Sequence, residues 1–100
     1  MNNLSDKQIL EVENQYWVDM WHSLERLQSN KDFQKVILQG YFKDKAVNGV
    51  SLLAQDAIVA GGHRSAVMED LIAISSLEDF FVTIENLGTI PSEEEEETLQ

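Results

Sequence analysis

Cysteine is absent from this chain of 100 residues, and proline occurs once, at Pro91. Without thiols the chain has no disulfide framework, no thiolate metal site and no cysteine nucleophile, and a reducing compartment is the simplest expectation. No stretch approaches the roughly eighteen apolar residues of a membrane span, and residues 1–8 lack the basic and apolar segments of a signal peptide. These absences predict a protein of the cytoplasm, or of a particle assembled there, with no membrane association.

Basic residues are scarce as well. The chain has 7 lysines and arginines against 18 aspartates and glutamates, which gives a net charge of −11. Five of the acids form the run Glu93–Glu97. Because such a run repels itself and stays solvated, we expect residues 89–100 to form a disordered acidic tail. The tail either serves solubility alone or docks as an acidic peptide on a basic partner surface.

Apolar residues recur at three- and four-residue spacings, whereas the alternation typical of β-strands is absent. This pattern predicts an all-α fold. Ser5 with Gln8 fits a capping box, and the apolar face that follows predicts a first helix over residues 6–28. Ser29 and Asn30 interrupt the pattern and are suited to cap a second helix.

Glycines mark where the later helices are expected to end or to pack closely. Gly40 is expected to end a short second helix in the left-handed conformation. Gly49 lies inside a third helix that begins at Tyr41, where it permits a neighbouring helix to approach. A fourth helix follows the paired glycines at 61–62 and stops at Gly88. The apolar stripe of this last helix is Val67, Leu71, Ile74, Leu77, Phe81, Ile84 and Leu87.

Together these helices predict a small helical bundle that forms a single domain over residues 1–88. Two long antiparallel helices form a hairpin, and two short helices fill its open side. A fold of this size buries only about 60–65% of the surface that its unfolded chain exposes, so we expect no deep substrate cleft.

The segment Asp32–Val47 combines three aromatic residues with three of the seven basic ones. Phe33 and Phe42 fall on the apolar stripes of their own helices, so we interpret them as core residues. Nucleic-acid binding would require exposed aromatics beside a basic groove, and the acidic balance of the chain repels phosphate. We therefore expect no direct contact with nucleic acid. Tyr41 has an amphipathic ring suited to a protein interface.

His22 and His63 are the imidazoles available for chemistry. His22 has Asp19 and Glu25 at three-residue spacings, but a carboxylate-bridged metal centre in a bundle requires a second such set, which the sequence lacks. His63 follows two glycines without the spacing of a phosphate-binding loop. No catalytic motif accompanies either histidine. We expect a non-enzymatic protein with no metal and no cofactor.

The first helix carries the candidate protein-binding residues. Trp17 and Trp21 lie one helical turn apart, and with Tyr16 and Met20 they leave little polar face. Tyr41 is a candidate neighbour. Because indoles are enriched at interface hot spots, this surface is expected to bind a partner protein or a second copy of the chain. The alternative is that the indoles pack in the core against the last helix.

Two segments carry a resemblance to a known group. They are "LERLQSNKDFQKVILQGYFKDKAV", Leu24–Val47, and "LIAISSLEDFFVTIENLG", Leu71–Gly88, and they cover roughly half of the chain. The leucine pair before an Asn and "DF", the "GYF" turn and the late apolar helix resemble small helical accessory proteins of tailed bacteriophages, encoded near virion structure and assembly genes. Where that group tends to have a basic residue in its last helix, this chain has Leu77, Glu78 and Asp79.

The resemblance implies a non-enzymatic bacteriophage protein that works by protein binding, as a minor virion component or an assembly factor. It places the protein in the host cytoplasm or in the virion. The acidic charge suggests an alternative, an inhibitor that blocks a nucleic-acid-binding host enzyme. Apolar virion contacts should respond little to salt, whereas an acidic inhibitor should lose affinity as salt screens its charge.

Overall fold

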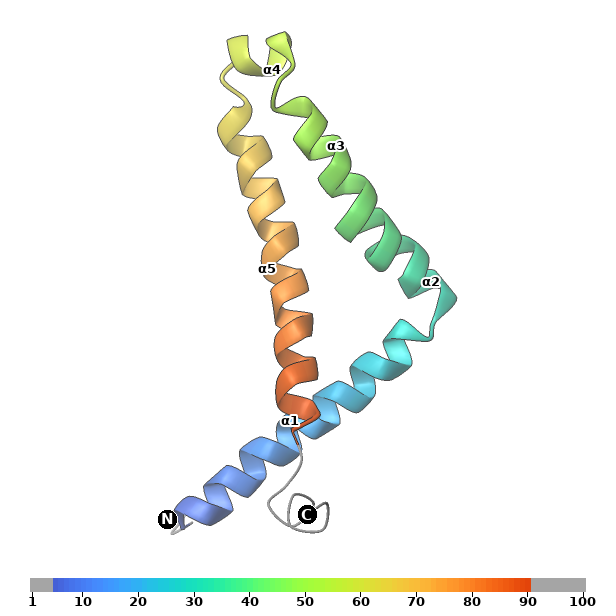
Figure 1. Ribbon diagram of the computed structural model, residues 1–100, viewed down its shortest axis with the longest axis vertical. Coiled ribbons are helices and arrows are strands. Elements are labelled where there is room, and N and C mark those ends of the chain that lie inside the picture. The colour runs from blue at the N-terminus through green and yellow to red at the C-terminus, as the bar shows by residue number, and fades with distance from the viewer. Residues whose placement is uncertain (1–4, 91–100) are drawn as a thin grey trace. The chain divides into compact units, whose positions relative to one another are not determined.

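The computed structural model describes residues 5–90, in which every regular element is a helix (Figure 1). The helices are α1 Asp6–Gln28, α2 Lys31–Phe33, the π-helix η1 Gln34–Asp44, α3 Lys45–Leu52, α4 Asp56–Ala60 and α5 Arg64–Gly88. No strand occurs within the described range, so the predicted all-α class is confirmed. Of the predicted acidic tail, only Thr89 and Ile90 lie inside this range, and the remainder lies outside the described residues.

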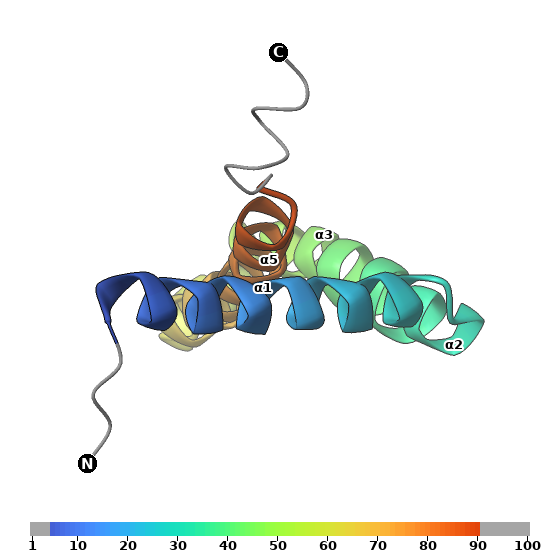
Figure 2. The same cartoon turned by 90° about the horizontal axis from the view of Figure 1, so that it is seen from below.

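Helix α1 begins at the predicted capping box. The Ser5 backbone N–H donates to Oε1 of Gln8 at 2.8 Å, and the Gln8 N–H donates to Oγ of Ser5 at 3.2 Å. These bonds satisfy N–H groups that have no carbonyl partner within the first turn. The helix then runs without interruption to Gln28, which confirms the predicted bounds (Figure 2).

The next helical run begins at the second predicted cap and does not stop at Gly40. Oδ1 of Asn30 accepts hydrogen bonds from the N–H groups of Asp32 and Phe33, at 2.9 and 3.0 Å. From there α2, η1 and α3 continue directly into one another. The prediction that Gly40 ends a short helix in the left-handed conformation is therefore wrong. Among the described residues, the positive φ belongs to Gly62, at 71°.

The π-helix η1 keeps four apolar residues of this run in line along one face. Four of the run's half-buried residues recur at intervals of four or five, namely Phe33, Ile37, Phe42 and Ala46, and Leu38, Gly40 and Tyr41 are half-buried beside them. In an α-helix, positions 33 and 46 would lie about 140° apart around the axis. A π-helix turns less per residue, because its hydrogen bonds span five residues, as in the bond from the Lys45 N–H to the Gly40 carbonyl. The wider turn thus brings these side chains back into line.

The predicted core residues Phe33 and Phe42 are half-buried instead of fully buried. Neither α2 nor η1 contains a fully buried residue. The two rings therefore line the covered side of the run without being enclosed by it. Lys35, Lys43 and Lys45, the three basic residues of the segment Asp32–Val47, are all exposed.

The chain divides into two compact units. We call Met1–Arg26 together with Phe81–Gln100 the terminal unit, and Leu27–Phe80 the hairpin unit. Helix α5 contributes its first part to the hairpin unit and its last turns to the terminal unit. A single domain over residues 1–88, with the two long helices packed as one antiparallel bundle, stays a prediction.

In the hairpin unit, α3 and the first part of α5 are antiparallel (Figure 1). Gly49 of α3 faces Leu71 of α5, and Nε of Arg64 donates to the carbonyl of Leu53 at 2.8 Å. Higher residue numbers on α3 thus pair with lower numbers on α5. A Cβ on Gly49 would lie 2.8 Å from Cδ2 of Leu71, which confirms that this glycine permits close packing. Helix α4 and the turn at Gly62 connect the two arms.

Few side chains are enclosed in either unit. Among residues 5–90, the buried apolar side chains are Leu24, Ile74 and Ile84, each 3% exposed. The predicted stripe of α5 is buried or half-buried from Val67 to Ile84. Leu87 departs from this stripe: it is 39% exposed, and Gly88 is the buried residue of the last turn. The predicted place of Leu87 in the stripe is therefore wrong, because the covered side at this end passes through the glycine.

Candidate protein-binding surface

Within the terminal unit, the last turn of α5 lies directly on α1 at two tryptophans. A Cβ on Gly88 would be 2.6 Å from the carbonyl oxygen of Trp17, and it would also clash with Cβ of Trp21. Only a residue without a side chain fits such a contact. Gly88 therefore determines how closely the end of α5 approaches the indole-bearing side of α1.

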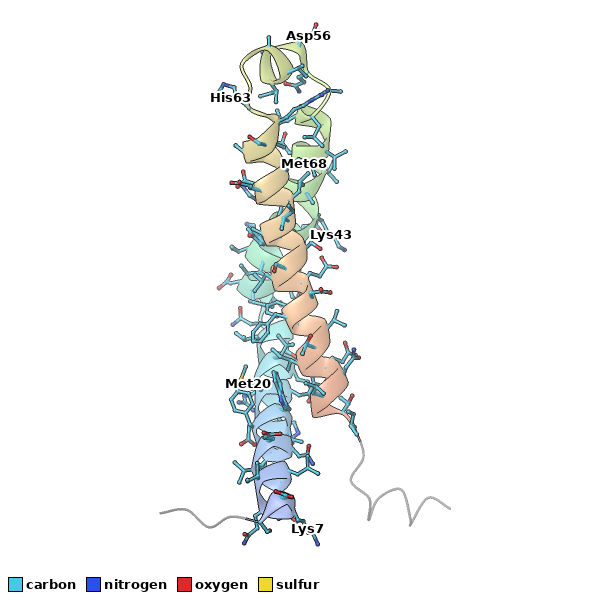
Figure 3. The ribbon with its side chains drawn as sticks, turned by 90° about the vertical axis from the view of Figure 1, so that its left-hand side faces the viewer. Lys7, Met20, Lys43, Asp56, His63 and Met68 are labelled. Atoms are coloured by element: carbon cyan, nitrogen blue, oxygen red, sulfur yellow. The ribbon has the colours of Figure 1, made fainter. Side chains whose placement is uncertain are left out.

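Trp17, Met20 and Trp21 are all half-buried on α1. Leu24, one turn beyond Trp21, is almost completely enclosed. Trp21 thus contributes side-chain atoms to the contact with α5 and Trp17 its backbone carbonyl, and part of each side chain remains accessible to a partner. Met20, on the same helix, is marked in Figure 3. Core packing and partner binding, the two interpretations of the tryptophans, are therefore compatible in this geometry.

Tyr16 is the most exposed of the predicted binding residues, with 54% of its surface accessible. Its ring packs edge-on against Trp17, with the ring centroids 5.1 Å apart and the planes at 82°. Such a pair is favourable because the positive edge of one ring meets the negative face of the other. Trp17 therefore holds the Tyr16 ring in place on the exposed side of α1.

Two further apolar side chains extend this exposed surface toward the start of α1. Val12 is 62% exposed and Ile9 is 44% exposed. With Tyr16 they have the spacing of residues that share one helix face, and we call these three residues the α1 stripe. Ile9 and Val12 are absent from the binding residues predicted from the sequence. The signal that identifies them is their three- and four-residue spacing to Tyr16.

The α1 stripe lies on a different side of the helix from the tryptophans. At about 100° per residue, its centre is about 110° around the axis from the centre of Trp17, Trp21 and Leu24. The contact with Gly88 therefore leaves the stripe uncovered. The broad apolar arc of α1 is thus covered along one edge and exposed along the other.

Polar side chains border the α1 stripe at both ends. Beyond Tyr16, Oδ1 of Asp19 accepts a hydrogen bond from Nε2 of Gln15 at 2.8 Å. Before Ile9, Ser5 and Gln8 form the exposed capping box. An apolar centre with a polar rim is the usual composition of a protein–protein interface.

Tyr41 lies in the hairpin unit, on η1, whereas the other four predicted binding residues lie in the terminal unit. It is half-buried, and its ring centroid is 5.9 Å from that of Phe42. A surface shared by Tyr41 and the tryptophans stays a prediction.

His22 and His63 are both exposed. The imidazole of His63 lies beside Gly61, where a Cβ would be 2.7 Å from Cδ2 and 2.8 Å from Nε2. Within residues 5–90, no group of three His, Cys, Asp or Glu side chains is arranged to hold a metal ion. In the same part of the chain, no helix combines the length and the apolar character needed to cross a bilayer.

Comparison with known proteins gives no match: the chain matches no protein-family model, no curated protein and no solved structure. The resemblance to phage accessory proteins therefore stays an expectation. The exposed side chains of the described residues are the basis for the proposed function.

Proposed function

We propose that this protein is a non-enzymatic bacteriophage protein that acts by binding another protein, as a minor virion component or an assembly factor. The α1 stripe carries the proposal, because Ile9, Val12 and Tyr16 expose three large apolar side chains along one helix face. Apolar side chains aligned in this way are typical of helices that lie in a partner's groove. The sequence resemblance supports the virion, or its assembly in the host cytoplasm, as the setting.

The energetics require a contact larger than the α1 stripe. Complete burial of a large apolar side chain contributes about 1.5–3 kcal/mol, and these three are already about half covered, so the stripe contributes on the order of 3 kcal/mol. Association costs roughly 4–15 kcal/mol in lost translational and rotational freedom. Leu10, which is 57% exposed, lies about 130° around α1 from the stripe, so a partner must wrap around the helix to contact both.

The chemistry of this contact separates the proposed function from an acidic inhibitor of a host enzyme. A contact centred on the α1 stripe is mainly apolar, so its affinity should change little with salt. An inhibitor would bind through its carboxylates, and its affinity would fall as the salt concentration rises. Measuring the binding affinity at several salt concentrations therefore distinguishes the proposed function from the inhibitor function.

Mass spectrometry of particles purified from infected cells tests the proposal. We expect the protein in particles or assembly intermediates in stoichiometric amounts. Val12→Lys should remove it from them, because the contact would then bury an unpaired charge. Asn14→Lys is the matched control, since position 14 lies about 170° around α1 from the stripe, and this variant should be incorporated normally.

Circular dichroism of both variants shows whether the helices are retained. If the wild-type protein is absent from particles and intermediates and instead captures a host polymerase or nuclease, the inhibitor function replaces the proposed one.

A further inference from the structure

The two sides of the hairpin formed by α3 and α5 differ in polarity. Gly49 and Leu71 mark the contact between the two helices. Two antiparallel helices in contact are related by a local two-fold axis perpendicular to both. Residues that follow the contact position of each helix by the same number of positions therefore lie on the same side of the pair. Val50 and Ile72 each follow a contact residue by one position, or about 100°, and therefore lie on the same side of the hairpin.

Large apolar side chains gather on this side. We call them the hairpin patch: Val47, Val50, Met68 and Ile72. They are 70%, 61%, 45% and 61% exposed, respectively. Each lies within three residues, or one helical turn, of the contact position on its own helix, and Val47, about 160° around α3 from that contact, lies at the outer edge of this side. The patch is therefore compact, and nothing within the hairpin unit covers it completely.

On the opposite side of the hairpin, the side chains nearest to the contact between the two helices are polar. Asn48 and Asp70 each precede a contact residue by one position, and both are exposed. Their rotation of about 100° in the other sense places them on the side away from the hairpin patch. The exposed apolar surface is thus a property of one side of the hairpin.

One basic and one acidic residue lie beyond the hairpin patch, one on each arm of the hairpin. Lys43 lies four residues before Val47 and six before the contact position of α3, whereas Asp79 lies seven residues after Ile72 and eight after the contact position of α5. Both are therefore roughly 9–12 Å from the contact in the same direction along the hairpin. Both are exposed, and Figure 3 marks Lys43 on the same side as Met68.

We propose that the hairpin patch is covered by the same patch of a second copy of this chain. A two-fold axis parallel to the hairpin lays α3 of each copy over α5 of the other and keeps every residue at its own height. Lys43 of each copy then meets Asp79 of the other copy, beside a closed apolar centre. The basic and the acidic residue of this pair belong to the same sequence and lie at a similar height along the hairpin. A two-fold contact between identical chains requires such a match, whereas a contact with an unrelated protein does not.

A two-fold axis perpendicular to the hairpin gives a different contact. It lays α3 over α3 and moves Lys43 to the other end of the hairpin, away from Asp79. The charge arrangement therefore selects the parallel axis. The inference is independent of the proposed function, because the α1 stripe belongs to the terminal unit.

Analytical ultracentrifugation of the full chain over a range of concentrations tests the second copy. We expect a monomer–dimer equilibrium that Ile72→Lys weakens at least tenfold, because the contact would bury an unpaired charge. Val50→Lys repeats the test on α3. Asn48→Lys, on the polar side, is the matched control and should leave the dissociation constant within about twofold. Circular dichroism checks that each variant keeps its helices.

Charge exchange tests the axis. Lys43→Glu or Asp79→Lys alone places like charges opposite each other at two points, which should weaken the dimer by about tenfold. A mixture of the two single variants should form heterodimers of near wild-type affinity, because every contact then joins opposite charges again.

Three results would overturn the inference. The first is a wild-type chain that stays monomeric at every concentration, which would leave the patch for a different protein. The second is a dimer that survives Ile72→Lys and Val50→Lys but is lost with Val12→Lys, which would place the self-contact on the α1 stripe. The third is a mixture of charge variants that associates no better than either variant alone.

Discussion

Gly49 of α3 lies so close to Leu71 of α5 that a Cβ on the glycine would be 2.8 Å from Cδ2 of the leucine. Gly88 makes a similar contact in the terminal unit, but the atoms that face it include the carbonyl oxygen of Trp17, which is backbone. A leucine methyl group can rotate aside, whereas a helix backbone cannot. The two glycines therefore differ in how they should tolerate a side chain.

Gly88→Ala should destabilise the protein more than Gly49→Ala. At Gly88 the added methyl group must push α5 away from α1, which should lower the free energy of unfolding by about 2 kcal/mol. At Gly49 a shift of Leu71 relieves the clash, and the better helix propensity of alanine offsets about 1 kcal/mol, so the net cost should stay below about 1 kcal/mol. Chemical-denaturation midpoints measure both, and equal costs would contradict the argument.

The Leu71→Ala background is the control for Gly49. It removes the Cδ2 atom that a Cβ on Gly49 would meet. In this background Gly49→Ala should become neutral or stabilising, because only its effect on helix propensity remains. An unchanged cost would show that the penalty at position 49 does not come from Leu71.

Tyr16→Ala should separate binding from folding. Tyr16 is more than half exposed, so its loss should lower the free energy of unfolding by no more than about 1 kcal/mol, the value of its ring contact with Trp17. Partner binding should weaken strongly. Trp17→Ala, at a half-buried position, should instead cost about 2–3 kcal/mol of stability. Stability and association are measured on the same samples, and a Tyr16→Ala variant that unfolds would assign the ring to the fold.

Ser5→Ala should loosen the start of α1. The substitution removes the Oγ acceptor of the capping box and should cost about 1 kcal/mol. Hydrogen exchange of the amides in the first turn should become faster while exchange in α5 is unchanged. Asn14→Ala, in the middle of the same helix, should not destabilise it, because alanine is the better helix former. Unchanged exchange after Ser5→Ala would mean that the box contributes nothing in solution.

Arg64→Lys should affect the turn between the arms of the hairpin without unfolding it. Lysine keeps the positive charge but has no Nε–H group placed to reach the Leu53 carbonyl, which is now bound at 2.8 Å. Since this bond is exposed, its loss should cost only about 0.5 kcal/mol. Faster hydrogen exchange confined to α4 is the expected result, and a change spread over α1 would refute this local role.

The parts of the fold that follow from neighbouring residues are predictable from the sequence. Ser5 and Gln8 fix the start of α1 by bonding to each other, and Asn30 caps the next helix with its own side chain. These interactions depend on residues two or three positions apart. The close approach at Gly49 is also foreseeable, because a glycine inside a helix weakens it unless a neighbour uses the space.

The parts that depend on distant contacts are not predictable in this way. Gly40 is a residue typical of helix ends, yet the helix continues through it as a π-helix, whose wider turn keeps Phe33 and Ala46 on one face. The apolar arc of α1 is visible in the sequence, but which edge of it α5 covers is decided by the contact of Gly88 with Trp17. The exposure of the α1 stripe therefore follows from packing alone.

Gly62, in the turn that leads into α5, has a φ of 71°, and the place where its side chain would begin has no contact within 4 Å. What excludes other amino acids there is their handedness and not their size, because a left-handed backbone is the natural conformation of a mirror-image residue. D-alanine introduced by chemical synthesis would fit the turn and restrict the unfolded chain, which should stabilise the protein by about 0.4–1 kcal/mol. L-alanine, with the same atoms, should destabilise it.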